Sequence, residues 1–325
     1  MKAGSALELS FIENVRMRRI LPEGSQVVAA VSGGGDSVAL LLLLECFRSH
    51  MGWDLEVLYV DHRTRPGTAS EAEFVEGLAE GLHLPFTLRT VSEEGSGSLE
   101  DRFSRERQRI FDSFGEAGYL VATGHTADDR AETLLLRLLE GAGLRGLGGM
   151  DYQGLGPVRR PVLDLTRSQL RDYLRQRGRE WMEDPTNRDD DIMRNRIRKE
   201  VLPVLESVHP GVSIALARSS ANLSLWRDYA DELISGSLDE LVRGATFRRR
   251  QYASLPEALR LSILWDIAGR PRGGRLEIEK TDLWILSGKN GQHVLPGGKA
   301  RICMDGEKGT VLHVEPSDER NRFVL

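Results

Sequence analysis

VVAAVSGGGDS, residues 27–37, is followed directly by the apolar run VALLLLLECF, residues 38–47. Five small or β-branched residues ending in Ser-Gly-Gly-Gly predict a buried strand that enters a tight turn, and the next run predicts a buried helix. Glycines let the backbone approach an anion closely, because no Cβ stands in the way. Free N–H groups at the positive end of a helix then point towards one spot, which suits a phosphate group.

Asp36 and Ser37 stand at the start of that helix, and two interpretations of them stay open. Either side chain can simply cap the helix. A carboxylate beside a bound phosphate is unfavourable, however, unless a metal ion neutralises both, which would make Asp36 a metal ligand. The stretch has neither the lysine of a Walker P-loop nor the GxGxxG spacing of dinucleotide-binding folds. Glycines of this kind also occur in α/β proteins for packing alone.

The composition is that of an ordinary globular protein. The chain has 325 residues, 40% of them hydrophobic and 29% charged, with a net charge of −5. This length allows two domains, and the charge argues against a surface made for indiscriminate nucleic-acid binding. No apolar run is long enough to cross a bilayer and no secretory signal is visible, so we expect a cytoplasmic protein without a membrane partner. Cys46 and Cys303 are too far apart for a CxxC metal site, and we expect Cys46 in the core.

The order of the predicted elements indicates an α/β fold with a doubly wound, mostly parallel sheet. A helix over residues 1–24 precedes the glycine stretch. Further strands are predicted at residues 55–60, 84–91, 119–123 and 158–163, and helices at residues 71–82, 99–114 and 166–177. Side chains at the carboxyl ends of such strands face the ligand crevice, which makes Asp61 and His62 candidates for nucleotide contacts. Capping of a turn explains Asp61 equally well.

A second polar cluster follows the fourth predicted strand, in GHTADDRAET, residues 124–133. Its titratable residues recur at spacings of three and four, on one side of a helix N-terminus: His125, Asp128, Asp129 and Glu132. Like charges at this spacing destabilise a helix unless something positive lies among them. A magnesium ion or the ammonium group of a substrate would supply that charge. The preference of acidic residues for helix N-termini accounts for only one or two of the three carboxylates.

Basic residues concentrate in two further segments. The helix predicted over residues 99–114 is dense in arginine, and its arginines can hold phosphates if they face the carboxyl edge of the sheet. IMRNRIRK, residues 192–199, is compatible with contacts to the phosphates of a polynucleotide, although a solvated helix face explains it as well. The glycine-rich segment 141–150 is either a mobile flap or a series of tight turns.

Residues 203–211 are expected to form a boundary between an N-terminal catalytic domain, residues 1–208, and a smaller C-terminal region, residues 209–325. In that region we predict helices over residues 212–241 and 256–269, followed by short glycine-rich strands. The arginines at 248–250, beside Phe247 and Tyr252, could contact RNA by stacking on bases, but a run of three is a weak signal.

Taken in order, these motifs resemble those of the tRNA(Ile)-lysidine synthetase family, within the PP-loop ATP pyrophosphatases. SGGGDS, VDH, TGHTADDRAETLLLRLLEGAGLRGLGGM, RRPVLDLTR and WMEDPTNRDDDIMRNRIRKEVLPVL follow one another between residues 27 and 208 in the family's order. The resemblance implies an enzyme that binds ATP and Mg²⁺ and adenylates the C2 oxygen of the first anticodon cytidine of a CAU-bearing tRNA(Ile). The ε-amine of L-lysine then displaces AMP, forming lysidine. A homodimer and a tRNA-binding C-terminal region are further family expectations.

The resemblance also implies roles for single residues. The phosphates of ATP would contact Ser32, Gly33, Gly34, Gly35, Asp36, Ser37 and Arg105, with Asp36 beside the metal ion. The reaction centre would contain His125, Asp128, Asp129 and Glu132. Among these, Asp129 and Glu132 would recognise lysine, because a cationic amine needs carboxylates. Phosphate of ATP or tRNA would contact Arg194, Asn195 and Arg198.

One departure from the family concerns the helix motif ARxxRY, which reads SRERQR at residues 104–109. Gln108 stands where the second arginine belongs, and whether Arg107 or Arg109 substitutes stays open. Two rival functions also remain. A tRNA thiolase or another adenylating PP-loop enzyme typically uses catalytic cysteines or an iron-sulfur cluster, for which the two cysteines are badly placed. A non-catalytic tRNA-binding module would be hindered by the acidic cluster.

Overall fold

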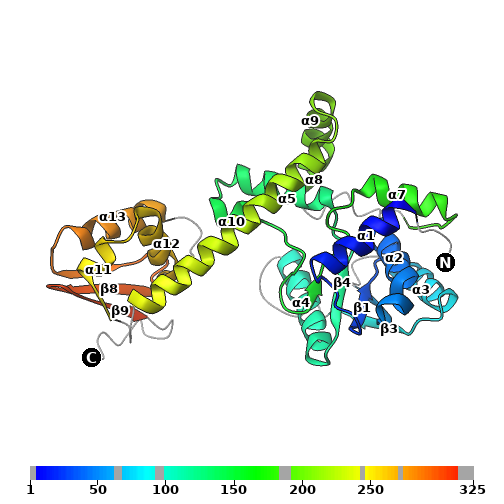
Figure 1. Ribbon diagram of the computed structural model, residues 1–325, viewed down its shortest axis with the longest axis horizontal. Helices are drawn as coiled ribbons and strands as arrows, with labels where there is room; N and C mark the ends of the chain where they lie inside the picture. Colours follow the sequence, from blue (N-terminus) through cyan, green and yellow to red (C-terminus); the bar gives the residue numbers. More distant parts are fainter. Residues whose placement is uncertain are drawn as a thin grey trace. The chain divides into compact units, whose positions relative to one another are not determined.

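The computed structural model describes residues 5–61, 68–91, 99–182, 192–241, 246–269 and 274–313. The chain forms two compact units, Met1–Trp226 and Arg227–Leu325 (Figure 1). They divide inside the long helix α10 (Val212–Leu241) rather than at residue 208. Much of the segment expected to be a boundary is itself helical, since helix α9 covers Leu202–Val208 with Pro203 in its first turn.

The N-terminal unit is built on a parallel five-stranded sheet in the order β3-β2-β1-β4-β5. The strands are β1 (Gln26–Ala30), β2 (Asp54–Asp61), β3 (Phe86–Thr90), β4 (Leu120–Thr123) and β5 (Val158–Arg159). The winding direction reverses between β1 and β4, which confirms the doubly wound sheet. Ligands of such sheets bind outside the carboxyl ends of the strands at this reversal. The glycine stretch follows β1 and the acidic cluster follows β4, so both motifs reach the same crevice.

Helices cover both faces of this sheet (Figure 1). The helices with most contacts to its strands are α2 (Gly35–Met51), α3 (Thr68–Gly81) and α4 (Leu99–Glu116). The same part of the chain also contains α1 (Ala6–Met17), α5 (Ala127–Leu139), α6 (Leu144–Leu147) and α7 (Arg167–Gln176). Successive residues of a strand point to opposite faces, so Val27 packs in the core with α2 while Val28 packs against Phe111 of α4. Helix α2 contacts β1, β2, α1 and α7, and this explains why its residues from Val38 to Leu44 are all buried. Cys46, expected in the core, is instead exposed on α2.

Two local predictions differ from the structure, and for a third segment the structure matches one of the two alternatives. The first helix covers only Ala6–Met17: Ser5 and Glu8 form a capping box at its start, and Arg19 adopts a positive φ of 50° after its end. The fifth strand contains only Val158–Arg159, because Pro161 has no N–H to continue the ladder. The glycine-rich segment 141–150 consists of tight turns around the one-turn helix α6, and Ser224 of α10 donates a hydrogen bond to the carbonyl of Gly148 at 2.6 Å.

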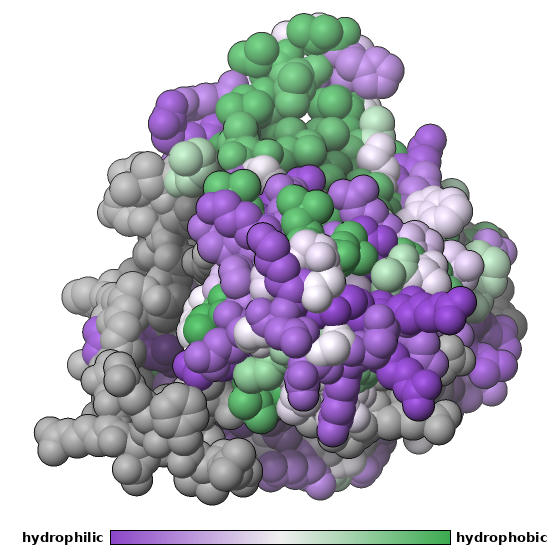
Figure 2. Space-filling model, turned by 90° about the vertical axis from the view of Figure 1, so that its left-hand side faces the viewer, coloured by the Kyte–Doolittle hydropathy of each residue, from purple (hydrophilic) through white to green (hydrophobic). Residues whose placement is uncertain are grey.

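A continuous helical stretch links α8 (Ile192–Arg196), the π-helix η1 (Ile197–Val201) and α9. It exposes the apolar side chains of Val201, Val204 and Val208 beside charged ones, and Figure 2 shows hydrophobic surface gathered near the top of the view, where α9 lies in Figure 1. None of the described helices combines the length and apolarity that crossing a membrane requires.

The C-terminal unit contains an antiparallel four-stranded sheet in the order β6-β9-β8-β7. Its elements are β6 (Thr246–Arg248), β7 (Gly291–Val294), β8 (Ala300–Asp305), β9 (Lys308–His313), α11 (Arg249–Ala253), α12 (Glu257–Ile267) and α13 (Arg275–Leu286). Helix α13 was not predicted. Its apolar residues come in pairs two apart, as in a strand, whereas the helix buries Ile278, Thr281, Asp282 and Ile285 at helical spacing, two of them polar.

The aromatic and basic run near residue 250 does not form a stacking surface. Phe247 and Tyr252 are 5% and 1% exposed and belong to the core of the C-terminal unit. Arg249 is also buried, and its guanidinium donates hydrogen bonds to the carbonyls of Gly288 and Lys289 after α13. The prediction that these aromatic side chains stack on RNA bases is therefore wrong, because both side chains are buried in the hydrophobic core.

Candidate active site

The glycine loop, residues 32–37, connects β1 to α2 and holds itself in place. Gly33 has a φ of +84°, a conformation that favours glycine. The Ser37 hydroxyl donates to the carbonyl of Gly34 at 2.9 Å and accepts a hydrogen bond from the backbone N–H of Ser32 at 3.1 Å. The N-cap of α2 is Gly34, which has no side chain to cover the first turn. The positive end of α2 is therefore left for an anion.

Two other segments pack closely against this loop. The backbone N–H of Met182 donates to the carbonyl of Gly33 at 2.9 Å, and the Trp181 ring lies against Gly35. On the other side, a Cβ on Gly124 would come within 3.0 Å of the Ser37 nitrogen. The loop glycines thus serve packing, and their close approach to an anion stays a prediction.

The start of α5 is capped, unlike that of α2. Thr126 and Asp129 form a capping box in which the backbone N–H and the hydroxyl of Thr126 both donate to Asp129 Oδ2 at 2.8 Å. This leaves Asp129 Oδ1 for the crevice. Capping of α5 therefore involves one oxygen of Asp129, within the one or two carboxylates that the sequence analysis assigned to the helix N-terminus.

Three arginines surround the remaining carboxylate oxygens of α5. Arg167 contacts Asp129 Oδ1 at 2.5 Å and Glu132 Oε1 at 2.7 Å. Arg194 and Arg198, one turn apart on α8 and η1, contact Glu132 at 2.9 and 2.8 Å. The Glu132 side chain is 0% exposed. The positive charge that the acidic cluster requires thus comes, in this structure, from the chain's own guanidinium groups.

Arg167 is the functional residue that the sequence analysis missed. It begins α7, directly after the N-cap Thr166, and lies near the loop as well as α5. Its Nε is 3.4 Å from Asp36 Oδ2, and its backbone N–H donates to Asp128 Oδ2 at 2.8 Å. Arg167 also contacts Asp129 and Glu132, so this one residue contacts all the acidic residues expected at the reaction centre. The available signal was an arginine that follows a helix cap just beyond the fifth predicted strand.

Burial and these guanidinium groups move the carboxyl pKa values in different directions. Burial raises the pKa of Asp36 to about 6, and the charge of Arg167 only partly offsets that rise. Burial would also raise the pKa of Asp129, but the charges of Arg167 and Arg194 and the hydrogen bond from the Thr126 backbone outweigh it and lower the value to about 2. The pKa of Glu132 is lowered in the same way, by Arg198 and Arg167 against burial.

His125 is held by a hydrogen bond between its imidazole and Thr123. Its Nδ1 lies 2.9 Å from the Thr123 hydroxyl, which donates its own proton to the carbonyl of Arg159 at 3.2 Å. Nδ1 therefore carries the imidazole proton and Nε2 the lone pair. Burial lowers the pKa of His125 to about 4, although the charge of Asp129 opposes the shift. Three guanidinium groups add to it, those of Arg160, Arg107 and Arg194.

The PP-loop domain family matches residues 9–205 of the chain. A tRNA(Ile)-lysidine synthase of Parasynechococcus marenigrum (strain WH8102) is 34% identical over 296 residues, which cover 86% of this chain and 87% of that relative. The chain belongs to the tRNA(Ile)-lysidine synthase family. This confirms the family that the order of motifs indicated.

Members of the tRNA(Ile)-lysidine synthase family differ in length. The synthase of Geobacter sulfurreducens is 41% identical to this chain over 230 residues. The match covers 68% of this chain but only 48% of that relative, so this chain spans about half of its length. Among solved structures, the U34-tRNA thiolase NcsA from Methanococcus maripaludis, with its 4Fe-4S cluster, superposes with a TM-score of 0.57 at 17% identity. The match covers 68% of this chain and 80% of that one, and it shows a shared fold.

The remaining residues expected at the synthase site are more scattered. Asp61 ends β2 and is partly buried, and its backbone carbonyl accepts a hydrogen bond from Val91 at 2.9 Å. His62 lies outside the described residues, as does the EDPTN motif at 183–187. Asn195 is partly buried on α8, and Arg105 is exposed on α4.

The structure also bears on the unusual SRERQR motif of this synthase. Gln108 donates to Asp112 Oδ1 at 2.8 Å, and Arg109 pairs with Glu106 on the surface of α4. Arg107 lies close enough to His125 for its charge to lower the pKa of that imidazole. Of the two arginines, Arg107 is the one whose charge acts on His125, and which of them replaces the missing arginine of the motif stays open.

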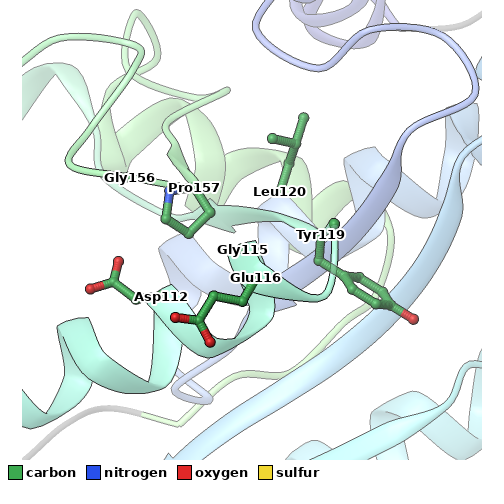
Figure 3. A pocket seen from close by; sticks show the side chains of 8 residues that line it. Asp112, Gly115, Glu116, Tyr119, Leu120, Gly156 and Pro157 are labelled. Carbon is green, nitrogen blue, oxygen red and sulfur yellow. The ribbon is translucent and has the colours of Figure 1, made fainter.

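A hollow of about 440 Å³ lies at the amino end of strand β4, away from the carboxyl ends where the candidate site lies (Figure 3). Asp112, Glu116 and Tyr119 line it, together with Leu120, the first residue of β4. It therefore opens at the amino end of that strand, whereas the glycine loop and the acidic cluster follow carboxyl ends. The hollow is separate from the site.

Proposed function

We propose that this chain ligates L-lysine to C2 of the first anticodon cytidine of a CAU-bearing tRNA(Ile), forming lysidine through an adenylated cytidine. The observation that carries the proposal is the meeting of an anion site and an acidic cluster at one sheet edge. The glycine loop presents an uncapped helix N-terminus, and Arg167 joins Asp36 of that loop to Asp129 and Glu132 of α5. The names of the relatives support tRNA(Ile) and lysidine as substrate and product.

The glycine loop is proposed to hold the phosphates of ATP through residues 32–37, with Asp61, His62 and Arg105 as further nucleotide contacts. No group of three or more acidic, histidine or cysteine side chains is arranged as a metal site among the residues described. Mg²⁺ commonly takes one or two carboxylates together with phosphate oxygens and water. Asp36 fits that role, because its side chain is 27% exposed at the end of the loop. The ion would neutralise charge on the departing pyrophosphate.

The α5 side of the crevice is proposed to receive the cytidine and the lysine. His125 offers a neutral acceptor, and Asp128 steadies the start of α7 through the backbone of Arg167. Asp129 and Glu132 are the carboxylates for the amine of lysine, which must compete with arginines for them. Arg194, Asn195 and Arg198 are proposed to contact phosphate of ATP or tRNA, so that Arg194 and Arg198 would exchange carboxylate for phosphate.

The C-terminal unit is proposed to bind tRNA, although its Phe247 and Tyr252 are not available for stacking. A thiolase is disfavoured by the positions of the two cysteines. Cys46 lies on α2 facing outward and Cys303 on β8 of the C-terminal unit, so neither belongs to the loops that build the site.

The proposal is tested by measuring the release of AMP and pyrophosphate from ATP with and without CAU-bearing tRNA(Ile), and with and without lysine. We expect pyrophosphate release to require tRNA, and AMP release to rise when lysine is added. A non-catalytic binding module would give neither product. Pyrophosphate release that depends on tRNA while AMP release ignores lysine would favour a different nucleophile, sulfur first.

A further inference from the structure

Arg167 divides one guanidinium group between two subsites. Its Nε faces Asp36 of the glycine loop at 3.4 Å, while Nη2 and Nη1 contact Asp129 at 2.5 Å and Glu132 at 2.7 Å. The side chain is 18% exposed, so these contacts form in a largely desolvated place where charge pairs are strong. The surrounding carboxylates raise the pKa of Arg167, which keeps the group charged.

This position sets Arg167 apart from the other arginines of the cluster. Arg194 and Arg198 also contact Glu132 and Asp129, but the ion pair described for Asp36 is with Arg167. A phosphate bound at the loop would attract the guanidinium towards Asp36. An ammonium bound at α5 would compete with the same guanidinium for Asp129 and Glu132. Each ligand therefore favours the arginine position that the other ligand needs.

We propose that Arg167 is a positioning residue that couples the two subsites. A phosphate-bearing ligand at residues 32–37 draws the guanidinium from Asp129 and Glu132, and so frees carboxylate oxygens for the amine of the nucleophile. The inference rests on the proposed function, since it assigns lysine to α5. Coupling between binding sites is reciprocal, and it typically changes affinity about 5- to 150-fold. We expect pyrophosphate to strengthen lysine binding about tenfold, and lysine to strengthen pyrophosphate binding equally.

The experiment is a calorimetric titration of the full chain with L-lysine, with and without saturating inorganic pyrophosphate and Mg²⁺. In Arg167→Gln the coupling factor should fall to about one, because the shared cation is gone. Lysine binding without pyrophosphate should be at least as strong as in the unaltered chain, since a competitor has been removed. A purely structural arginine would weaken both ligands and leave their ratio unchanged.

Arg137→Gln is the matched control, because Arg137 pairs with Glu140 on the exposed side of α5. It should keep the full coupling. If Arg167→Gln fails to fold, Arg167→Lys decides, because one ammonium group cannot reach Asp36, Asp129 and Glu132 together as the three guanidinium nitrogens do. Reduced coupling supports the proposal and unchanged coupling overturns it. Binding of both ligands without coupling in the unaltered chain overturns this inference alone. Absence of lysine binding under every condition overturns it together with the proposed function.

Discussion

Asp36 and Asp129 carry the same side chain in one crevice, yet their pKa values move apart, to about 6 and about 2. The difference follows from their partners. Asp129 has Arg167, Arg194 and the backbone of Thr126 to offset its burial, whereas for Asp36 the charge of Arg167 only partly does so. Near pH 6 one carboxyl is half protonated while the other is fully ionised.

The site should therefore lose activity on acidification through Asp36. A carboxyl with a raised pKa is ionised only above that value, and a protonated Asp36 cannot hold Mg²⁺. We expect kcat/KM for ATP, which reports the free enzyme, to fall below about pH 6 with the slope of one proton. The profile should be recorded with just enough Mg²⁺ to keep ATP as its magnesium complex, because a large excess would compete with the proton for Asp36 and shift the acid limb to lower pH. An acid limb that begins only below about pH 4.5 would contradict this role for Asp36.

The sequence predicted that the carboxylates of this cluster need positive charge nearby, but it did not predict which residues supply that charge. The spacing of Asp128, Asp129 and Glu132 required a positive charge, and the sequence offered magnesium or an amine for it. The structure supplies Arg167, Arg194 and Arg198 from later parts of the chain. No local pattern reveals such a pairing, because it depends on how α7 and α8 pack against α5.

At the scale of elements, two strand-to-helix turns build the site by pressing against each other. The turn after β4 touches the first turn of α2, where a Cβ on Gly124 would come 3.0 Å from the Ser37 nitrogen and 3.1 Å from its Cα. Both neighbouring atoms belong to the backbone in a packed region, so moving them to make room for a Cβ would cost free energy. The close packing of the glycine loop against the turn that carries the acidic cluster thus requires a residue without a Cβ at position 124.

Gly124→Ala should force these turns apart. We expect a loss of about 1–3 kcal/mol of unfolding free energy, as for overpacked cores, and at least a tenfold loss of adenylation rate. Gly77→Ala is the control, because Gly77 lies inside α3 with open space around its Cα. That change should stabilise the chain by about 0.5–1 kcal/mol and leave the rate unchanged. Denaturant titration and the adenylation assay measure both effects, and a normal rate in folded Gly124→Ala would refute the steric argument.

Elements with strong local signals were predicted correctly, and those decided by distant contacts were not. The buried run before Cys46 and the Thr166 cap indicated α2 and α7, which the structure confirms. Helix α13 was missed because Thr281 and Asp282 are buried on its inner side. Asp282 is acceptable there only because Arg260 and Tyr252, both earlier in the chain, bind its oxygens.

At the scale of the whole molecule, the two compact units have separate cores, and this predicts separable stability. Asp282 sits at the centre of the C-terminal core, where Arg260 contacts both its oxygens at 2.9 and 3.1 Å and the Tyr252 hydroxyl donates at 2.6 Å. Removing one partner of a buried ion pair costs about 3–5 kcal/mol, since the other charge stays buried.

Asp282→Ala should therefore unfold the C-terminal unit at a lower temperature and leave the glycine loop able to bind pyrophosphate. Thermal unfolding of the full chain, followed by calorimetry with and without pyrophosphate and Mg²⁺, measures both. We expect one transition to move down while the transition that pyrophosphate stabilises stays in place. A matching loss of pyrophosphate binding would show that the units do not behave independently.

The central claim is lysine transfer to tRNA(Ile) at this site, and one assay tests it most directly. Labelled L-lysine, ATP and Mg²⁺ are incubated with the full chain and a CAU-bearing tRNA(Ile) transcript, beside a methionine tRNA and the variant Asp36→Ala. We expect label in tRNA(Ile) alone, and none with Asp36→Ala although that variant still binds tRNA. Label in both tRNAs would contradict the proposed substrate, and no label in tRNA(Ile) despite tRNA-dependent pyrophosphate release would contradict lysine as the nucleophile.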